Sequence, residues 1–179
     1  MTKYIAFLRA INVGGHNVKM EQLKQLFESL GFSNVTAFIA SGNLVFETSA
    51  KNAAALEKKI EAVLQGALGY EVSTFLRTPA ELDAIAKYQA FKPAEVESAL
   101  ALNVAFLAEP LDAAALQKLM ALENEIDRFH VHGREVYWLC AKKQSDSKFS
   151  NAVLERAIKA RATLRGVKTV QKMAEKFCS

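Results

Sequence analysis

The order in which apolar residues alternate or recur at helical spacing constrains the fold of this chain more than any other feature. In the first 77 residues, the pattern predicts strands at 4–8, 35–40, 44–47 and 72–77, with helices at 20–30 and from about 56 to Gly69. Residues 102–177 repeat this order, with predicted strands at 102–107, 126–132, 135–140 and 162–165 and helices after Asp112, at 149–158 and at 167–177. The order β-α-β-β-α-β is that of a ferredoxin-like unit. The sequence therefore predicts an α+β protein with two ferredoxin-like subdomains in tandem.

The predicted subdomains are residues 1–77 and 99–179, the second including a closing C-terminal helix, with a linking helix and loop at 78–98. Thr78 and Glu81 form a capping box around Pro79, which marks the start of the linking helix. Residues 89–96, which include Pro93, are expected to be a linker. No sequence motif is matched between the halves, so the interpretation is a repetition of architecture only.

The connection after the first strand, residues 9–17, is the clearest functional stretch. It contains an arginine and two glycines and leads into a helix start, where unpaired N–H groups favour anions. In a ferredoxin-like unit the first and third strands are antiparallel neighbours, so this connection and the hairpin turn at 41–43 share one end of the sheet. The resulting set of donors suits a phosphate or carboxylate group. The predicted ligand-binding residues are Arg9, Asn12, Gly14, Gly15, Asn17, Ser41, Gly42 and Asn43.

A structural interpretation of the same residues is left open. Asn12, Asn17 and Asn43 can hold turns and caps for their own backbone. The Gly14–Gly15 pair is neither a Walker loop nor a dinucleotide fingerprint. His16 is the candidate general acid–base if the loop is catalytic. The sequence leaves open whether the protein is an enzyme.

Positive charge is concentrated in the last third of the chain. Residues 128–179 carry a net charge of +8 and residues 1–127 a net charge of −4. Topology places Arg77 at the end of the first sheet away from Arg9, and gathers the other members of a secondary basic patch at one end of the second sheet. That patch either contacts an anion or nucleic acid, or is a solvated surface with Ser147 as a helix cap. Its residues are Arg77, Lys142, Lys143, Ser147, Lys148, Arg165 and Lys168.

Other common chemistries have little support in the sequence. Cys140 and Cys178 are too few for a disulfide framework or a zinc site. His130 and His132 share one face of a predicted strand, but no third ligand is near in sequence, so no metal is expected and exposed positions are the interpretation. No apolar run reaches the ~18 residues of a membrane span, and no signal peptide is recognised, so a cytoplasmic location without membrane contact is expected.

Three stretches resemble the bacterial domain-of-unknown-function family 1697: Leu8–Asn17, Ser41–Phe46 followed by Arg77, and Gly133–Tyr137 with Ser147–Phe149. The resemblance covers nearly the whole chain. It implies a cytoplasmic protein of two ferredoxin-like subdomains and no established activity. The family usually carries a Thr-x-Arg-Asn-Trp-Asn-Thr stretch near its C-terminus. Here the stretch 163–169 keeps Thr163, Arg165 and Thr169 but lacks the Asn-Trp-Asn centre.

Three functional hypotheses follow. The favoured one is binding of a small anionic ligand, such as a nucleotide or another phosphate- or carboxylate-bearing molecule, at the Arg9 connection and the 41–43 turn. The second is a nucleic-acid-binding module that uses the basic C-terminal third, although the sequence lacks the aromatic pattern of an RNA-binding sheet. The third is a protein-interaction module without ligand chemistry. The cofactor, the ligand and the oligomeric state are not specified by the sequence.

Overall fold

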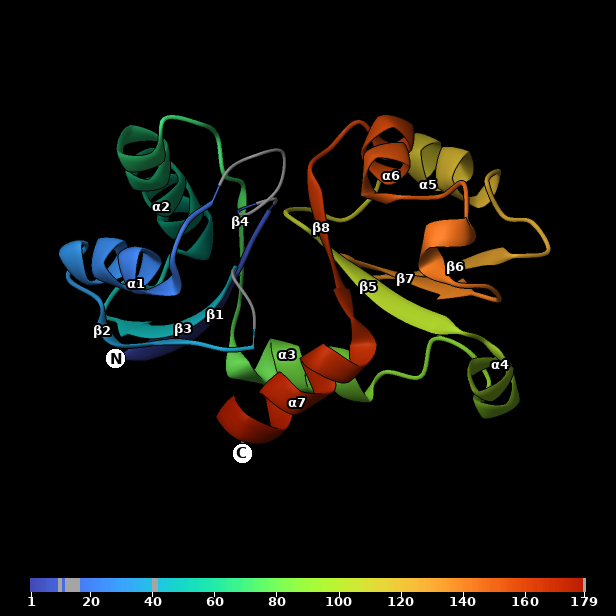
Figure 1. The fold of residues 1–179 in the computed structure, drawn as a ribbon, viewed down its shortest axis with the longest axis horizontal. Coiled ribbons are helices and arrows are strands. Elements are labelled where there is room, and N and C mark those ends of the chain that lie inside the picture. Colours follow the sequence, from blue (N-terminus) through green and yellow to red (C-terminus); the bar gives the residue numbers. More distant parts are fainter. Residues whose placement is uncertain (10, 12–16, 40–41, 179) are drawn as a thin grey trace. The chain divides into compact units, whose positions relative to one another are not determined.

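The computed structural model describes residues 1–9, 11, 17–39 and 42–178. The chain forms two compact units, unit 1 from residues 1–84 and 172–179 and unit 2 from residues 85–171 (Figure 1). The sequence placed residues 172–179 with the second subdomain, whereas their contacts assign them to unit 1. Both boundaries fall inside helices, at Ala84 in α3 and at Gln171 in α7.

Unit 1 contains a four-stranded antiparallel sheet with the strand order β2-β3-β1-β4. Helices α1 and α2 cover one face of this sheet (Figure 1). The buried ring of Phe46 contacts Phe27 of α1 edge-on and stacks on Phe32 at 4.4 Å, which joins the helix layer to the sheet. The elements are β1 (Thr2–Leu8), α1 (Met20–Ser29), β2 (Ser33–Ala37), β3 (Asn43–Thr48), α2 (Ala53–Leu68), β4 (Thr74–Arg77) and α3 (Pro79–Lys87).

Unit 2 has the equivalent strand order β6-β7-β5-β8, and helices α5 and α6 cover one face of the sheet (Figure 1). Trp138 is fully buried in this core, and Phe149 packs edge-on against its indole ring at 4.8 Å. The elements are α4 (Pro93–Ser98), β5 (Ala101–Leu107), α5 (Ala113–Met120), β6 (Asp127–His132), β7 (Glu135–Cys140), the 3₁₀ helix η1 (Gln144–Asp146), α6 (Asn151–Ile158), β8 (Ala162–Gly166) and the first part of α7 (Val167–Phe177), which continues into unit 1.

The two units match residue by residue in their central strands. Leu8 pairs with Thr74 at the start of β4, and Leu107 pairs with Ala162 at the start of β8, so these positions are counterparts. This register aligns Ile5-Ala6-Phe7-Leu8 with Val104-Ala105-Phe106-Leu107, and Leu76-Arg77 with Leu164-Arg165. These matches add a few shared residues to the repeated architecture that the sequence predicted. The shared residues are too few to detect before the register shows which positions correspond.

The outer edges of β4 and β8 are covered in the same way. Glu61 of α2 accepts the Thr74 N–H at 2.9 Å, and Glu155 of α6 accepts the counterpart Ala162 N–H at 2.8 Å. Glu57 accepts a second N–H of β4, that of Leu76, at 2.9 Å. These carboxylates accept hydrogen bonds from backbone N–H groups of the edge strands, which would otherwise be free to pair with another strand.

The predicted fold class is confirmed, and so are several local signals. Thr78 and Glu81 form the capping box, with reciprocal hydrogen bonds of 3.0 and 3.2 Å. The expected linker at 89–96 was partly wrong, because Pro93 begins the short helix α4 at a position where its missing N–H costs nothing. The expectation that Ser147 caps a helix was also wrong, since Ser150 accepts the Val153 N–H at the start of α6.

Candidate anion-binding sites

One end of the unit 1 sheet holds the described part of the predicted ligand site. The Leu8 N–H donates to the Gly42 carbonyl at 2.8 Å, and the Arg9 N–H donates to the Ser73 carbonyl at 2.9 Å. Phe7 pairs with Asn43 in the sheet register. The structure therefore brings Arg9, Gly42 and Asn43 to the same end of the sheet. The predicted residues Asn12, Gly14, Gly15, Ser41 and His16 lie outside the described residues, and Asn17 is exposed before α1.

The turn before β3 uses its own polar groups. The buried Asn43 side chain donates from Nδ2 to the Phe38 carbonyl at 3.3 Å, and the Phe38 N–H donates to the Asn43 carbonyl at 3.0 Å. Gly42 has φ +95°, a conformation that glycine adopts without strain. Ile39 has φ +65°, a left-handed backbone conformation that is costly for a β-branched residue, and its side chain is 54% exposed. Asn43 therefore serves the turn, as the structural interpretation expected, and the turn stores strain at Ile39.

A buried hydroxyl lies at the same sheet end as Arg9. Thr74 pairs with Leu8 and is 3% exposed, and its Oγ1 has no hydrogen-bond partner in the described part of the chain. Buried polar groups are nearly always paired, and leaving one unpaired costs roughly 1–3 kcal/mol. Two apolar residues, one within the Arg9 connection and one just after it, are buried in the core. Ile11 is buried and its carbonyl accepts the Tyr70 hydroxyl at 3.1 Å, and Val18 is also buried.

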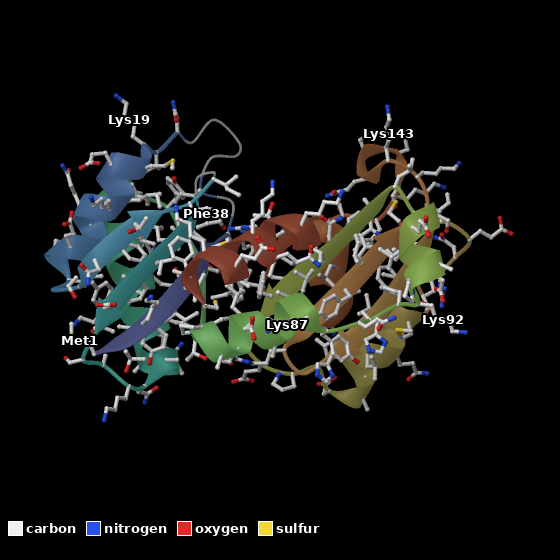
Figure 2. The ribbon with its side chains drawn as sticks, turned by 90° about the horizontal axis from the view of Figure 1, so that it is seen from below. Met1, Lys19, Phe38, Lys87, Lys92 and Lys143 are labelled. Atoms are coloured by element: carbon white, nitrogen blue, oxygen red, sulfur yellow. The ribbon has the colours of Figure 1, made fainter. Side chains whose placement is uncertain are left out.

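The secondary basic patch is only partly assembled. Arg77 belongs to unit 1, pairs with Ile5 and is 1% exposed, so it is a core residue. In unit 2, Ala101 pairs with Cys140 and Asn103 pairs with Gly166, so β7 and β8 both end beside the start of β5, at the same end of the sheet. The lysines at that end of the sheet are exposed, and Lys143 extends away from the ribbon (Figure 2). They are Lys142, Lys143, Lys148 and Lys168.

The two other members of that patch have internal roles. The Ser147 hydroxyl contacts both carboxylate oxygens of Asp127 at 2.8 Å, and Trp138 donates its indole N–H to the same carboxylate at 2.8 Å. An anion at Ser147 would therefore meet a buried carboxylate. Arg165 donates to the Leu164 carbonyl and the Thr163 hydroxyl, each at 2.8 Å. Burial lowers the pKa of the Arg165 guanidinium to about 10, so it stays protonated at neutral pH.

The sequence did not predict the surroundings of the unit 2 histidines. The Tyr88 hydroxyl and His130 Nε2 lie 2.7 Å apart, and the Tyr88 ring stacks on His132 at 3.9 Å. His130 is half-buried, so the expectation of an exposed position was wrong for it. The contact with Tyr88 could not be seen in the sequence, because the two residues are 42 positions apart. No group of three or more metal-binding side chains occurs within residues 1–9, 11, 17–39 and 42–178.

A second set of residues was also missed: Arg156, Lys159 and Arg161, which line a surface hollow beside α6. Their clustering within six residues was a visible signal. Elsewhere, burial raises the pKa of the Cys140 thiol, which disfavours the thiolate form. In the part of the chain that the structure describes, no helix has the length and apolar character to cross a bilayer.

Comparison with known proteins gives a family and a fold. The family model described as protein of unknown function, DUF1697, matches residues 1–137. No curated protein matches the chain. A solved structure of a conserved bacterial protein from Streptococcus pneumoniae is similar, with a TM-score of 0.74 and 24% sequence identity over 97% of each chain. At that identity the likeness shows the same fold and nothing about function.

Proposed function

The chain belongs to the DUF1697 family, whose members are described only as proteins of unknown function, and we propose that it binds a small anionic ligand. The ligand carries a phosphate or carboxylate group and binds in unit 1, where β1 ends and β3 begins. The observation that carries the proposal is the Leu8–Gly42 hydrogen bond of 2.8 Å, which joins the Arg9 connection to the turn before β3. A cytoplasmic location for this activity stays a prediction.

Three features of the described residues support this location. Arg9 supplies a guanidinium that can bind phosphate or carboxylate through two parallel hydrogen bonds. The Thr74 hydroxyl is buried without a partner in the described part of the chain, and a bound oxyanion would accept a hydrogen bond from it. The strained Ile39 lies in the adjoining turn, and strain of this kind is concentrated at ligand sites.

Thermal unfolding against a panel of phosphate- and carboxylate-bearing metabolites tests the proposal. We expect at least one compound to raise the Tm of the wild-type protein by roughly 5 °C or more at saturation. Arg9→Ala should remove that increase. Lys58→Ala, which deletes one exposed cation on α2, should retain it. A panel without any increase, or an equal increase in Arg9→Ala, contradicts the proposal.

A second variant tests the hydroxyl. Thr74→Val replaces the unpaired Oγ1 by a methyl group of similar size and should stabilise the ligand-free protein by about 1 kcal/mol. If the ligand accepts a hydrogen bond from Thr74, the same variant should show a smaller Tm increase with ligand. A ligand-induced increase equal to that of the wild type would exclude Thr74 from the site.

Nucleic-acid binding is the second candidate, because the exposed lysines at 142, 143, 148 and 168 share one end of the unit 2 sheet. Fluorescence anisotropy with a labelled oligonucleotide would show affinity that falls steeply with salt, and a smaller salt slope in Lys142→Ala/Lys143→Ala. Weak binding that is insensitive to this double substitution would leave only nonspecific attraction. The protein-interaction module remains a prediction without a described feature that favours it.

A further inference from the structure

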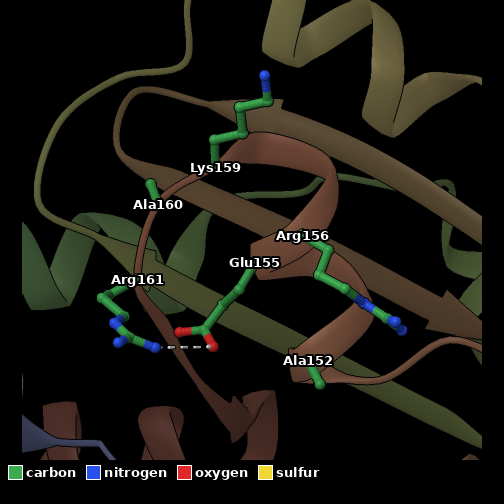
Figure 3. Close-up of a pocket in the computed structure, with 6 residues that line it drawn as sticks. All are labelled: Ala152, Glu155, Arg156, Lys159, Ala160 and Arg161. Carbon is green, nitrogen blue, oxygen red and sulfur yellow. Dashed lines mark ion pairs between the residues drawn. The ribbon is translucent and has the colours of Figure 1, made fainter.

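The hollow beside α6 in unit 2 is lined almost entirely by charged and small residues. It has a volume of about 620 Å³. Three cations and one carboxylate surround it, and the two remaining residues are alanines, whose short side chains leave the space open (Figure 3). The lining residues are Ala152, Glu155, Arg156, Lys159, Ala160 and Arg161.

The hollow lies at the sheet end that corresponds to the Arg9 site of unit 1. The connection 159–161 leads into Ala162, which pairs with the end of β5, just as Thr74 pairs with the end of β1. The preceding helices differ in length: α2 continues for seven residues after Glu61, whereas α6 continues for three after the counterpart Glu155. The unit 1 connection, residues 69–73, contains no cation, whereas the unit 2 connection contains two.

Lys159 occupies a backbone position that favours glycine. It follows α6 with φ +55°, in the left-handed region, where α2 is followed by Gly69 at φ +84°. A lysine in this conformation is strained relative to glycine. The fold would therefore be more stable with glycine at this position, so the lysine side chain is not there to support the backbone turn.

The charges around the hollow leave an excess of positive charge. Glu155 is engaged through both oxygens: Oε2 accepts the Ala162 N–H at 2.8 Å, and Oε1 lies 4.0 Å from Arg161 Nη1. Neither the Arg156 side chain nor the Lys159 side chain makes a hydrogen bond or ion pair with another described residue. Figure 3 shows Arg161 beside Glu155, while Arg156 and Lys159 extend in other directions. This arrangement suits an extended anion better than a single compact one.

We propose that this hollow binds a diphosphate or triphosphate group through Arg156, Lys159 and Arg161. Guanidinium groups match phosphate oxygens in pairs, and the lysine adds a point charge. The lining contains no aromatic or large apolar side chain, so the site recognises the phosphate chain and not an attached base or sugar. The proposal does not depend on the Arg9 site, which lies in the other unit.

Calorimetric titration of the full chain with inorganic pyrophosphate tests the inference, with orthophosphate for comparison. We expect tighter binding of pyrophosphate than of orthophosphate, and a Kd roughly tenfold or more higher in Arg156→Ala and Lys159→Gly. Lys159→Gly is informative because glycine fits the left-handed backbone, so its Tm should not fall. Lys118→Ala removes an exposed cation from the last turn of α5, another eight-residue helix, and should bind as the wild type does.

Three results would overturn the inference: no pyrophosphate binding at millimolar concentration, wild-type affinity in both Arg156→Ala and Lys159→Gly, or an equal loss in Lys118→Ala. The last result would mean that these cations act only through the general positive charge of the surface. Loss of pyrophosphate binding in Arg9→Ala, with Lys159→Gly unaffected, would place the ligand in unit 1 and also overturn it.

Discussion

Unit 1 and unit 2 each place basic residues at the corresponding end of their own sheet, but on different connections. In unit 1 the central strand β1 is followed directly by Arg9, whereas the counterpart position after β5 is Ala108. In unit 2 the cations follow the second helix, at Lys159 and Arg161, where unit 1 has none. The strand register is kept in both units because it builds the core. The charged residues differ between the units in the connections outside the sheet, so the two proposed sites are expected to bind different anions.

The units also differ in how deeply they bury one matched arginine. Arg77 and Arg165 are counterparts and each donates to the carbonyl of the preceding leucine at 2.8 Å. Arg77 is 1% exposed, whereas Arg165 remains partly accessible and also bonds the Thr163 hydroxyl. The arginine is therefore a repeated structural element, and unit 1 depends on it more.

The largest effect we expect comes from truncating these arginines. Arg77→Ala removes a buried side chain and its hydrogen bonds and should lower the free energy of unfolding by about 3 kcal/mol. Arg165→Ala should cost less, about 2 kcal/mol, because water can enter where the side chain was. Urea unfolding of both variants at pH 7 measures the difference. An equal or greater loss in Arg165→Ala would contradict the ranking by burial.

A second contrast concerns pH. The register makes Val45 of unit 1 the counterpart of Tyr137 in unit 2, whose hydroxyl donates to the Ile85 carbonyl at 2.9 Å. Burial raises the pKa of Tyr137 above its usual value of 10, and the nearby Glu135 carboxylate adds to the shift. Because the folded pKa exceeds the unfolded one, this stabilisation is complete below about pH 10 and is lost as the pH rises towards the folded pKa.

Tyr137→Phe tests the pH contrast. At pH 8 the variant should be less stable than the wild type by about 1 kcal/mol, through loss of the hydroxyl hydrogen bond. Above pH 10 the free energy of unfolding of the wild type should fall by up to about 1.4 kcal/mol per pH unit, whereas Tyr137→Phe has no hydroxyl to titrate there. The two free energies of unfolding should therefore become equal near pH 11. Urea unfolding at several pH values measures this. A difference that stays constant from pH 8 to pH 11 would show that Tyr137 does not titrate between the two states.

The smallest effect concerns the edge of β8. Asn151 occupies the position in α6 that Glu57 has in α2, four residues before the shared glutamate. It donates from Nδ2 to the Ala162 carbonyl at 2.9 Å, while its buried Oδ1 has no partner in the described part of the chain. Asn151→Glu would place a carboxylate at the α6 N-terminus, as unit 1 has along β4, and should stabilise the protein by about 0.5 kcal/mol.

The reverse exchange, Glu57→Asn, should destabilise unit 1 by about 1 kcal/mol, because the Leu76 N–H loses its charged acceptor. Thermal unfolding of both variants, followed by circular dichroism, shows whether each substitution raises or lowers the Tm. A stabilised Glu57→Asn or a destabilised Asn151→Glu would mean that the amide–carbonyl contact of unit 2 is the better arrangement.

Local sequence signals predicted most of the fold. The capping box at Thr78, the Asp112 cap of α5 and the Gly133 turn between β6 and β7 each depend on residues within a few positions of one another. For this reason they can be recognised without knowing the tertiary structure. The same holds for the order of strands and helices, since the apolar periods identify each element separately. The shared sheet end of Arg9 and Asn43 then followed from the expected topology.

Side-chain roles set by distant contacts were not predictable in this way. Ser147 resembled a helix cap, yet Asp127, twenty residues earlier, binds its hydroxyl. Arg165 resembled a surface cation, yet pairing of β8 with β5 half-buries it, and its guanidinium donates to Thr163 and Leu164. His130 resembled an exposed hairpin residue, yet Tyr88 bonds it across 42 residues. The sequence by itself determined the elements, their order and their caps, because these depend on short-range sterics and hydrogen bonds. Only the tertiary structure decided which polar groups are buried or paired, because each depends on which distant strand or loop closes over it.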